Sequence, residues 1–256
     1  MSDALPERNL KLTLEYDGSA YAGWQLQAGQ PTVQRELMDA VSRMTGEAPS
    51  ITVAGRTDAG VHAVGQVASL RTRSHVEARR FLSGLNGLLP RDISVHSVEE
   101  VPLAFNARHD SLGKCYRYRV LVSPQRAALE EGRVWHIRHP MALEAMRAAA
   151  CLLVGEHDFN AFRSSACDAP HARRNMIRID IDALLRSPTA QVVEILFHAN
   201  AFCRHMCRIL AGTLVEVGMG KRTAENVAAV LESRDRTQAG VTAPPGGLTL
   251  MQVFYP

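Results

Sequence analysis

The chain has 256 residues, of which 46% are hydrophobic and 21% are charged, with a formal net charge of +3. These values are typical of a soluble globular protein with one large domain or two of ordinary size. The longest apolar runs fall well short of the ~18 residues that a membrane-spanning helix needs. The polar first eight residues, with two acids, do not resemble a secretory signal. The composition therefore argues against a membrane protein.

Five cysteines are present and none of them forms a C-x-x-C pair. They are Cys115, Cys151, Cys167, Cys203 and Cys207. An odd number of unpaired positions is typical of a reducing compartment, in which thiols stay free. We therefore expect a cytoplasmic protein.

Arginine dominates the basic residues, since 26 of the 29 are arginine. They gather in clusters along the chain: Arg71, Arg73, Arg79 and Arg80; Arg108, Lys114, Arg117 and Arg119; Arg173, Arg174 and Arg178; Arg204 and Arg208. The planar guanidinium group suits phosphate oxygens and stacks on bases. The clusters predict a polyanionic partner bound on one face, although a solvated surface would give the same pattern.

Hydrophobic periodicity divides the first half into alternating strands and helices. It predicts strands over residues 9–15, 51–54, 64–72 and 92–98. A helix follows Val33 and ends at Gly46, and a second is predicted to run to about Gly87 behind a capping box formed by Ser74 and Glu77. The order β-α-β-β-α-β is that of a ferredoxin-like unit.

The second half repeats this order with one extra helix. Strands are predicted over residues 115–122, 176–185, 191–198 and 248–254, and helices over residues 142–154, 202–217 and 223–231. We therefore expect an α+β protein of two ferredoxin-like or RRM-like units with antiparallel sheets, over residues 1–108 and 109–256. A cleft between them is the expected active site.

A glycine-flanked turn between two predicted strands carries a single carboxylate. It reads Gly55-Arg56-Thr57-Asp58-Ala59-Gly60-Val61-His62. Glycine allows a tight turn and the close approach of a partner, so Asp58 is a candidate reactive group. Taken alone, the octamer favours the simpler interpretation that Asp58 hydrogen-bonds its own turn.

Two further groups of residues suggest chemistry less strongly. Cys203, His205 and Cys207 resemble metal ligands, but on a helix His205 would point away from both thiols, so buried thiols are favoured and no metal is expected. Tyr116 and Tyr118 alternate with two arginines, so one face of the strand is predicted to stack a base or lie half-buried, and the other to meet phosphate or acids. Arg208, beside an apolar helix face, needs a carboxylate partner, for which Asp58 is one candidate.

Motifs across almost the whole chain resemble one family, the tRNA pseudouridine synthase A family, which modifies positions 38, 39 and 40 of the anticodon stem-loop. The matching residues are Gly55 to Ala63; Tyr16 to Ser19 with Tyr21, Gly23, Trp24 and Gln25; Tyr116 to Tyr118; Asn200 to Phe202 with His205, Met206 and Arg208; Asp235 to Thr237; and Gly247 to Leu250 through Pro256. Cys203 and Cys207 stand where the family usually has aliphatic residues. The resemblance implies a pseudouridine-synthase fold.

The resemblance also implies an isomerase that converts uridine in tRNA to pseudouridine without a cofactor or a metal. It places the nucleophile on Asp58, attacking uracil C6 or ribose C1′, and its ion-pair partner on Arg208. Tyr116 matches the tyrosine that packs on the target uracil, Arg56 matches an arginine that fills the space of the flipped nucleotide, and Leu248 matches a substrate-binding position. The partners implied are tRNA and a second copy of the chain, in a homodimer.

Two other classes of function are weighed against this one. An RNA-binding module of two RRM-like units would carry no chemistry, but the chain has no obvious RNP1 string. A glycosidase-type hydrolase using Asp58 would need a second carboxylate nearby, and the turn contains none. The isomerase is the leading hypothesis.

Overall fold

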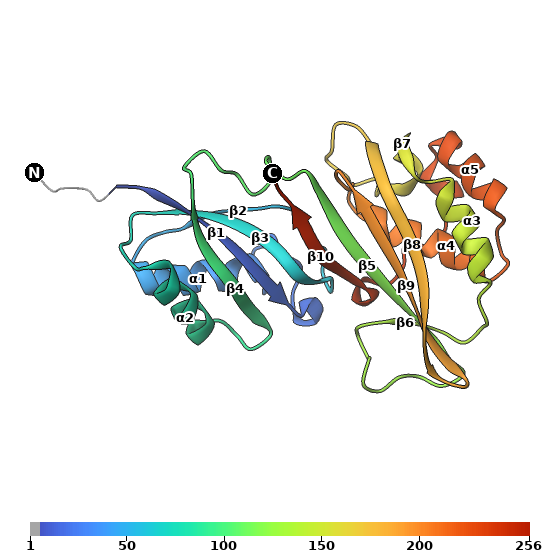
Figure 1. The fold of residues 1–256 in the computed structure, drawn as a ribbon, viewed down its shortest axis with the longest axis horizontal. Helices are drawn as coiled ribbons and strands as arrows, with labels where there is room; N and C mark the ends of the chain where they lie inside the picture. The colour runs from blue at the N-terminus through green and yellow to red at the C-terminus, as the bar shows by residue number, and fades with distance from the viewer. Residues whose placement is uncertain (1–5) are drawn as a thin grey trace, which may run out of the picture. The chain divides into compact units, whose positions relative to one another are not determined.

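The computed structural model describes residues 6–256 and has an α+β fold with five α-helices in that range (Figure 1). The chain forms two compact units. Unit 1 comprises the residues up to Leu112 together with Leu250–Pro256, and unit 2 comprises Gly113–Thr249. We describe each unit by itself.

Unit 1 is an antiparallel sheet with two helices. In chain order its elements are β1 (Arg8–Tyr16), α1 (Val33–Thr45), β2 (Ser50–Val53), β3 (His62–Thr72), α2 (Ala78–Leu88) and β4 (Ile93–Val101). β1 pairs with both β3 and β4, and β2 pairs with β3. β10 (Leu248–Phe254) also adjoins β3. The four strands expected from the sequence in this half are confirmed.

Helix α1 begins and ends where local chemistry requires. The side chain of Thr32 caps its first turn by accepting a hydrogen bond from the amide of Arg35 at 3.3 Å. Gly46 ends it in the left-handed conformation, with φ of 74°. Val33, Leu37 and Val41 fall on one face and are fully buried, which confirms the predicted helix.

The capping box predicted ahead of α2 is wrong. Glu77 itself occupies the N-cap position and its side chain makes no capping hydrogen bond. The hydroxyl of Ser74 instead accepts a hydrogen bond from the amide of Val76 at 3.3 Å. The backbone is still extended at Glu77, so Ser74 lies three residues too early to cap the helix.

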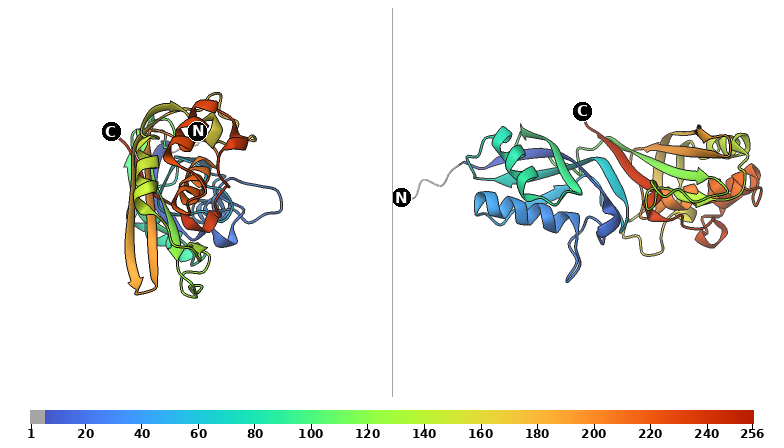
Figure 2. Two further views of the ribbon diagram at one scale, coloured as in Figure 1. Left: turned by 90° about the vertical axis from the view of Figure 1, so that its right-hand side faces the viewer. Right: turned by 90° about the horizontal axis from the view of Figure 1, so that it is seen from below.

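Unit 2 is built around a long antiparallel hairpin. Its elements are β5 (Gly113–Val122), β6 (Trp135–Ile137), α3 (Leu143–Cys151), β7 (Gly155–Asp158), β8 (Arg173–Ser187), β9 (Ala190–Ala199), α4 (Met206–Gly218) and α5 (Ala224–Ser233). The strand order is β5-β9-β8-β7, and β6 pairs in parallel with β5. The three helices gather beside β8 (Figure 1), while the β8–β9 hairpin extends beyond them (Figure 2).

The start of α4 differs from the expectation. The sequence predicts a helix from Phe202, but α4 begins at Met206. His205 lies in the left-handed region with φ of 62°, which interrupts a right-handed helix. Phe202 and Cys203 therefore belong to the loop before the helix. The predicted placement of Cys203 on this helix is wrong for the same reason.

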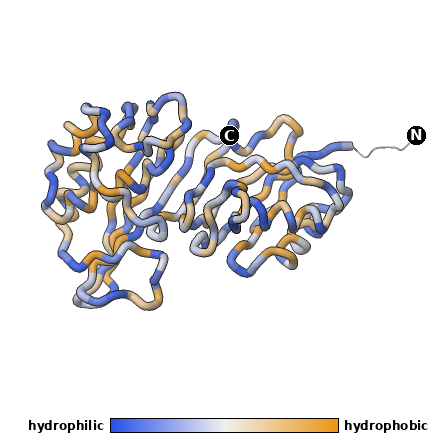
Figure 3. Tube along the Cα trace, turned by 180° about the vertical axis from the view of Figure 1, so that it is seen from behind, coloured by the Kyte–Doolittle hydropathy of each residue, from blue (hydrophilic) through white to orange (hydrophobic). Residues whose placement is uncertain are grey.

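Hydrophobic and hydrophilic residues are interspersed along the strands and helices of both units (Figure 3). Within residues 6–256, no helix is both long enough and apolar enough to cross a membrane.

Candidate active site

The turn that carries Asp58 links β2 to β3 in unit 1. Its base is closed by a hydrogen bond from the amide of Ala54 to the carbonyl of Val67 at 2.8 Å. The amide of Val61 donates to the carbonyl of Asp58 at 3.1 Å, and Gly60 provides the left-handed residue with φ of 75°. Asp58 is half-buried and Arg56 is exposed, so both are within reach of a large substrate.

Two buried polar side chains of the sheet, Tyr16 and Gln66, form hydrogen bonds with residues of this turn. The hydroxyl of Tyr16 lies 2.7 Å from Oγ1 of Thr57, the residue before Asp58. The amide group of Gln66 donates to the Tyr16 hydroxyl at 3.2 Å and to the carbonyl of Gly55 at 2.8 Å. Burial raises the pKa of Tyr16 to about 12, and its hydrogen bonds to Thr57 and Gln66 only partly offset this. The network fixes the turn from the sheet side.

The loop after β1 supports the same turn through its backbone. The amide of Trp24 donates to the carbonyl of Thr57 at 3.0 Å, and the amide of Gly60 donates to the carbonyl of Tyr21 at 3.3 Å. Gly23 has φ of 99°, and a Cβ placed on it would lie 2.6 Å from the carbonyl oxygen of Thr57. Only glycine allows the two backbones to approach this closely.

His62 anchors the end of the turn. Its Nδ1 accepts a hydrogen bond from the amide of Gly18 at 3.1 Å and lies 3.1 Å from Oδ1 of Asp17. The hydroxyl of Tyr21, in the loop after β1, donates to Oδ1 of Asp92, just before β4, at 2.7 Å. The Asp58 turn is therefore held on two sides by hydrogen bonds within unit 1.

Strand β5 in unit 2 carries the two predicted tyrosines on its buried side. Tyr116 is 7% exposed and meets the ring of Phe202 edge to face, with 5.0 Å between centroids. Tyr118 is fully buried and its hydroxyl donates to the carbonyl of Pro244 at 2.8 Å. Burial raises the pKa of Tyr118, while the nearby guanidinium of Arg208 acts in the opposite direction.

The arginines on the other side of β5 face carboxylates. Arg119 forms ion pairs with Glu130 at 2.6 Å and Glu194 at 3.2 Å, and Arg117 lies 3.6 Å from Glu194. The sequence predicts that this face meets either phosphate or acids. In the structure it contacts acids of the same unit.

Arg208 lies in the first turn of α4 and forms two hydrogen bonds with Ala243 in a later loop. Its Nε donates to the carbonyl of Ala243 at 2.8 Å, and the amide of Ala243 donates to the carbonyl of Arg208 at 3.1 Å. Leu248 begins β10 and is 5% exposed. The turn just before it packs closely, since a Cβ on Gly247 would lie 2.7 Å from the Tyr118 ring.

Asp58 and Arg56 belong to unit 1, whereas Tyr116, Arg208 and Leu248 belong to unit 2. Within unit 2, Arg208 is close enough to Tyr118 to affect its pKa.

Sequence reasoning missed the supporting residues. Tyr16, Thr57 and His62 lie inside the recognised motifs, but a motif does not reveal which side chains contact each other. Gln66 gave one usable signal, because a buried strand position occupied by a polar residue requires a hydrogen-bond partner.

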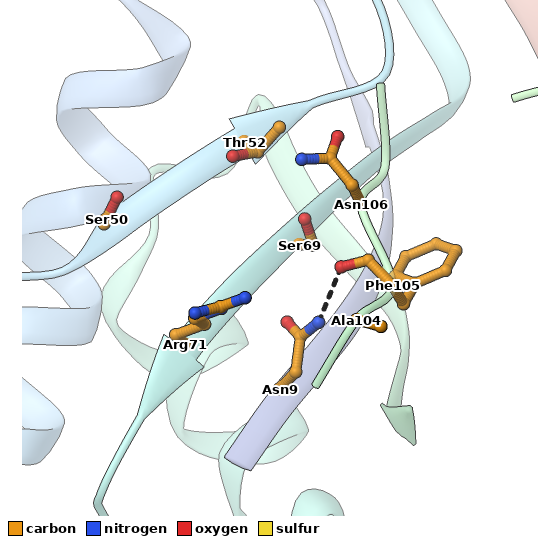
Figure 4. A pocket seen from close by; sticks show the side chains of 8 residues that line it. All are labelled: Asn9, Ser50, Thr52, Ser69, Arg71, Ala104, Phe105 and Asn106. Carbon is orange, nitrogen blue, oxygen red and sulfur yellow. Dashed lines mark hydrogen bonds between the residues drawn. The ribbon is translucent and has the colours of Figure 1, made fainter. Parts of the chain in front are cut away.

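A polar pocket on unit 1 lies elsewhere on the sheet and is lined by none of the predicted site residues (Figure 4). Its lining includes Asn9, whose side chain donates to the carbonyl of Phe105 at 2.8 Å, as well as Thr52, Ser69 and Arg71. In the part of the chain that the structure describes, no three potential ligands are grouped as for a metal ion.

Comparison with known proteins assigns the family. The model of the tRNA pseudouridine synthase family matches residues 13–110 and 149–256. A protein of Myxococcus xanthus named tRNA pseudouridine synthase A is 47% identical over 246 residues, covering 96% of this chain and 91% of its own. Proteins of the same name from Citrifermentans bemidjiense (45% identity; 97% of this chain, 98% of theirs) and Geotalea daltonii (43%; 97% and 100%) are similar throughout.

A match of this extent covers both the Asp58 turn and the Arg208 helix. The chain belongs to the tRNA pseudouridine synthase family, whose members are isomerases that convert uridine in tRNA to pseudouridine.

Proposed function

We propose that this chain isomerises uridine to pseudouridine at positions 38, 39 and 40 of the tRNA anticodon stem-loop, with Asp58 as the nucleophile. In this reaction the C1′–N1 bond breaks, the uracil turns, and C5 forms the new bond to C1′. C5 loses its proton and N1 gains one, so the product is an isomer of the substrate. No cofactor or metal takes part.

The observation that supports this proposal best is the way the Asp58 turn is held. Thr57, next to Asp58 in the chain, forms hydrogen bonds through both its side chain and its carbonyl. The loop after β1 and a buried Tyr16–Gln66 pair thus restrain the backbone, while Asp58 itself is half-buried. A nucleophile held by its backbone needs little reorganisation before attack.

The other predicted residues take supporting roles in the proposal. Tyr116 packs on the target uracil and assists removal of the C5 proton. Arg208 supplies a fixed positive charge, as the ion-pair partner that the resemblance to the family implies for Asp58. Arg56 fills the space left by the extruded nucleotide, which must leave the stem because its glycosidic bond is otherwise inaccessible. Leu248 contacts the substrate from an apolar position.

We also propose two ferredoxin-like units, an N-terminal one with the Asp58 turn and a C-terminal one with Tyr116 and Arg208. The sequence divides them into residues 1–108 and 109–256, whereas residues 109–112 and 250–256 pack with the N-terminal unit. The βαββαβ order of the first unit and its antiparallel strand order β4-β1-β3-β2 support this division. The tRNA is bound by a homodimer through arginine clusters other than the one with Arg117 and Arg119, and these clusters meet phosphates and read the shape of the stem. The enzyme works in the cytoplasm, where its substrate is found.

The test uses the purified protein and unmodified tRNA. Pseudouridine is mapped by carbodiimide treatment and reverse transcription, with untreated tRNA and enzyme-free tRNA as controls. We expect new stops only at positions 38, 39 and 40. An absence of stops despite tRNA binding would indicate a binding module, and release of free uracil would indicate a hydrolase.

A further inference from the structure

Two cysteines of unit 2 lie in loops that are hydrogen-bonded to one another, although the cysteines are 36 residues apart in the chain. Cys167 follows the short turn that begins at Ser164, and Cys203 lies in the loop before α4. Each thiol is near enough to the other to affect its pKa. Each of the five cysteines of the chain is a free thiol.

Backbone hydrogen bonds hold the two segments together. The amide of Ser164 donates to the carbonyl of Arg204 at 3.0 Å, and the amide of Arg204 donates to Sγ of Cys167 at 3.5 Å. The guanidinium of Arg204 donates to the carbonyl of Ala166 at 3.3 Å. Cys167 is thus fixed against the residue that follows Cys203, which places the two cysteines in adjoining loops.

The two thiols differ in accessibility and in acidity. Cys167 is half-buried, whereas Cys203 is only 6% exposed. Partial burial alone would raise the pKa of Cys167, but the amides of Ala169 and Arg204, with Arg163 nearby, outweigh it and lower that pKa. Burial raises the pKa of Cys203 to about 11. An accessible thiol of lower pKa beside a buried thiol of higher pKa is the arrangement of an attacking and a resolving cysteine.

We propose that Cys167 and Cys203 are a modification site at which a hydroperoxide forms a reversible intramolecular disulfide. The Cys167 thiolate attacks the peroxide oxygen, the O–O bond breaks, and Cys167 becomes a sulfenic acid while the second oxygen leaves as water or an alcohol after protonation. The Cys203 sulfur then attacks the Cys167 sulfur, the S–O bond breaks, and water leaves with the thiol proton of Cys203. The peroxide is reduced by two electrons and the thiol pair is oxidised by two.

The position of this pair is next to residues of the proposed active site. Cys203 is joined directly to Phe202, whose ring contacts Tyr116, and the amide of Met206, at the start of α4, donates to the carbonyl of Cys203 at 3.1 Å. The modification site therefore lies at the base of the helix that carries Arg208. The chemistry of the thiol pair is independent of the proposed tRNA reaction and is tested without it.

The full-length protein is treated with a small excess of hydrogen peroxide, quenched with N-ethylmaleimide at acidic pH, and digested with trypsin without reduction. We expect a linked pair of the peptides 164–173 and 187–204, with the loss of two hydrogens, that disappears after dithiothreitol. The Cys203→Ser variant should instead accumulate a Cys167 sulfenic acid that reacts with dimedone. Cys151, which is exposed, is the control for thiols that react through exposure alone.

The Cys167→Ser variant gives the decisive comparison. Cys203 should then resist peroxide, with oxidation slowed roughly tenfold or more, because it is buried and of raised pKa. Circular dichroism checks that both variants fold, and Cys115→Ser serves as a matched substitution of another buried thiol. Peroxide oxidation of Cys203 at the wild-type rate in Cys167→Ser, or wild-type oxidation that yields no linked peptides, would overturn the proposal.

Discussion

The hydroxyl of Tyr16 lies 2.7 Å from Oγ1 of Thr57, and so a buried residue of the first strand is hydrogen-bonded to the neighbour of the proposed nucleophile. This contact joins two segments that are 41 residues apart in the chain. The contact therefore fixes the Asp58 turn relative to the first strand of the sheet. Four predictions about the turn and Arg208 test how the site is held, and a fifth tests its chemistry.

Thr57→Val should destabilise the protein and slow the reaction. The substitution keeps the shape but removes the hydrogen bond between Oγ1 of Thr57 and the buried hydroxyl of Tyr16, a loss of roughly 1–3 kcal/mol in the free energy of unfolding. Urea unfolding and single-turnover tritium release from C5-labelled tRNA measure the two effects. Thr57→Ser keeps the hydroxyl and is the matched control. If Val and Ser behave alike, the hydrogen bond does not support the turn.

Gly23→Ala should displace the Asp58 turn. A Cβ at this position would lie 2.6 Å from the carbonyl oxygen of Thr57, and its φ of 99° is strained for any residue but glycine. We expect a loss of roughly 1–3 kcal/mol of stability and a fall in kcat larger than any change in tRNA affinity. Gly29→Ala, in an open part of the same loop at φ of 69°, separates backbone strain from the close contact. Equal effects of the two variants would contradict the role of the contact.

Stability should fall at high pH in part because of Tyr16. The unfolded residue ionises near pH 10.0 but the folded residue only near pH 12, so between these values the unfolded state alone releases the proton. The contribution is complete below pH 10 and is lost as the pH rises towards 12. Urea unfolding across this range should give a steeper decline for the wild type than for Tyr16→Phe. Parallel curves would contradict the raised pKa.

Arg208→Lys should slow the reaction although it keeps the charge. Lysine cannot reproduce the planar guanidinium whose Nε donates to the carbonyl of Ala243 at 2.8 Å, so its charge is placed less firmly. We expect a loss of rate on the order of tenfold for Lys and on the order of a hundredfold for Ala, with tRNA affinity within a few fold. Single-turnover tritium release measures the rates. Equal rates for the wild type and Arg208→Lys would remove Arg208 from this role.

Much of the fold could be predicted because its signals are local. Helix α1 has a cap, an apolar stripe and a terminal glycine that all agree. The start of α4 could not be predicted, since nothing in the residue type of His205 announces its left-handed backbone. β6 and β7 have three and four residues and are too short to show the alternation of apolar and polar residues that identifies a strand. They form because longer strands beside them offer free edges.

The candidate site, like the fold, could be predicted only in part. The motif around Asp58 indicated the reactive turn, but the residues that hold it come from distant positions such as Tyr16 and Gln66. Contacts of this kind depend on strand register, which the sequence specifies only through the complete fold. The proximity of the Cys167 loop and the Cys203 loop was hidden for the same reason, because distant residues such as Arg204 and Cys167 join the two loops.

The central claim, that Asp58 is the nucleophile of a uridine isomerase, is tested most directly by Asp58→Asn. The variant keeps the size of the side chain and the turn but removes the carboxylate charge. Tritium release from C5-labelled uridine in tRNA is measured beside tRNA binding by the same preparation. We predict release at the level of enzyme-free controls, with binding within a few fold of wild type. Sustained turnover by the folded variant would contradict the account.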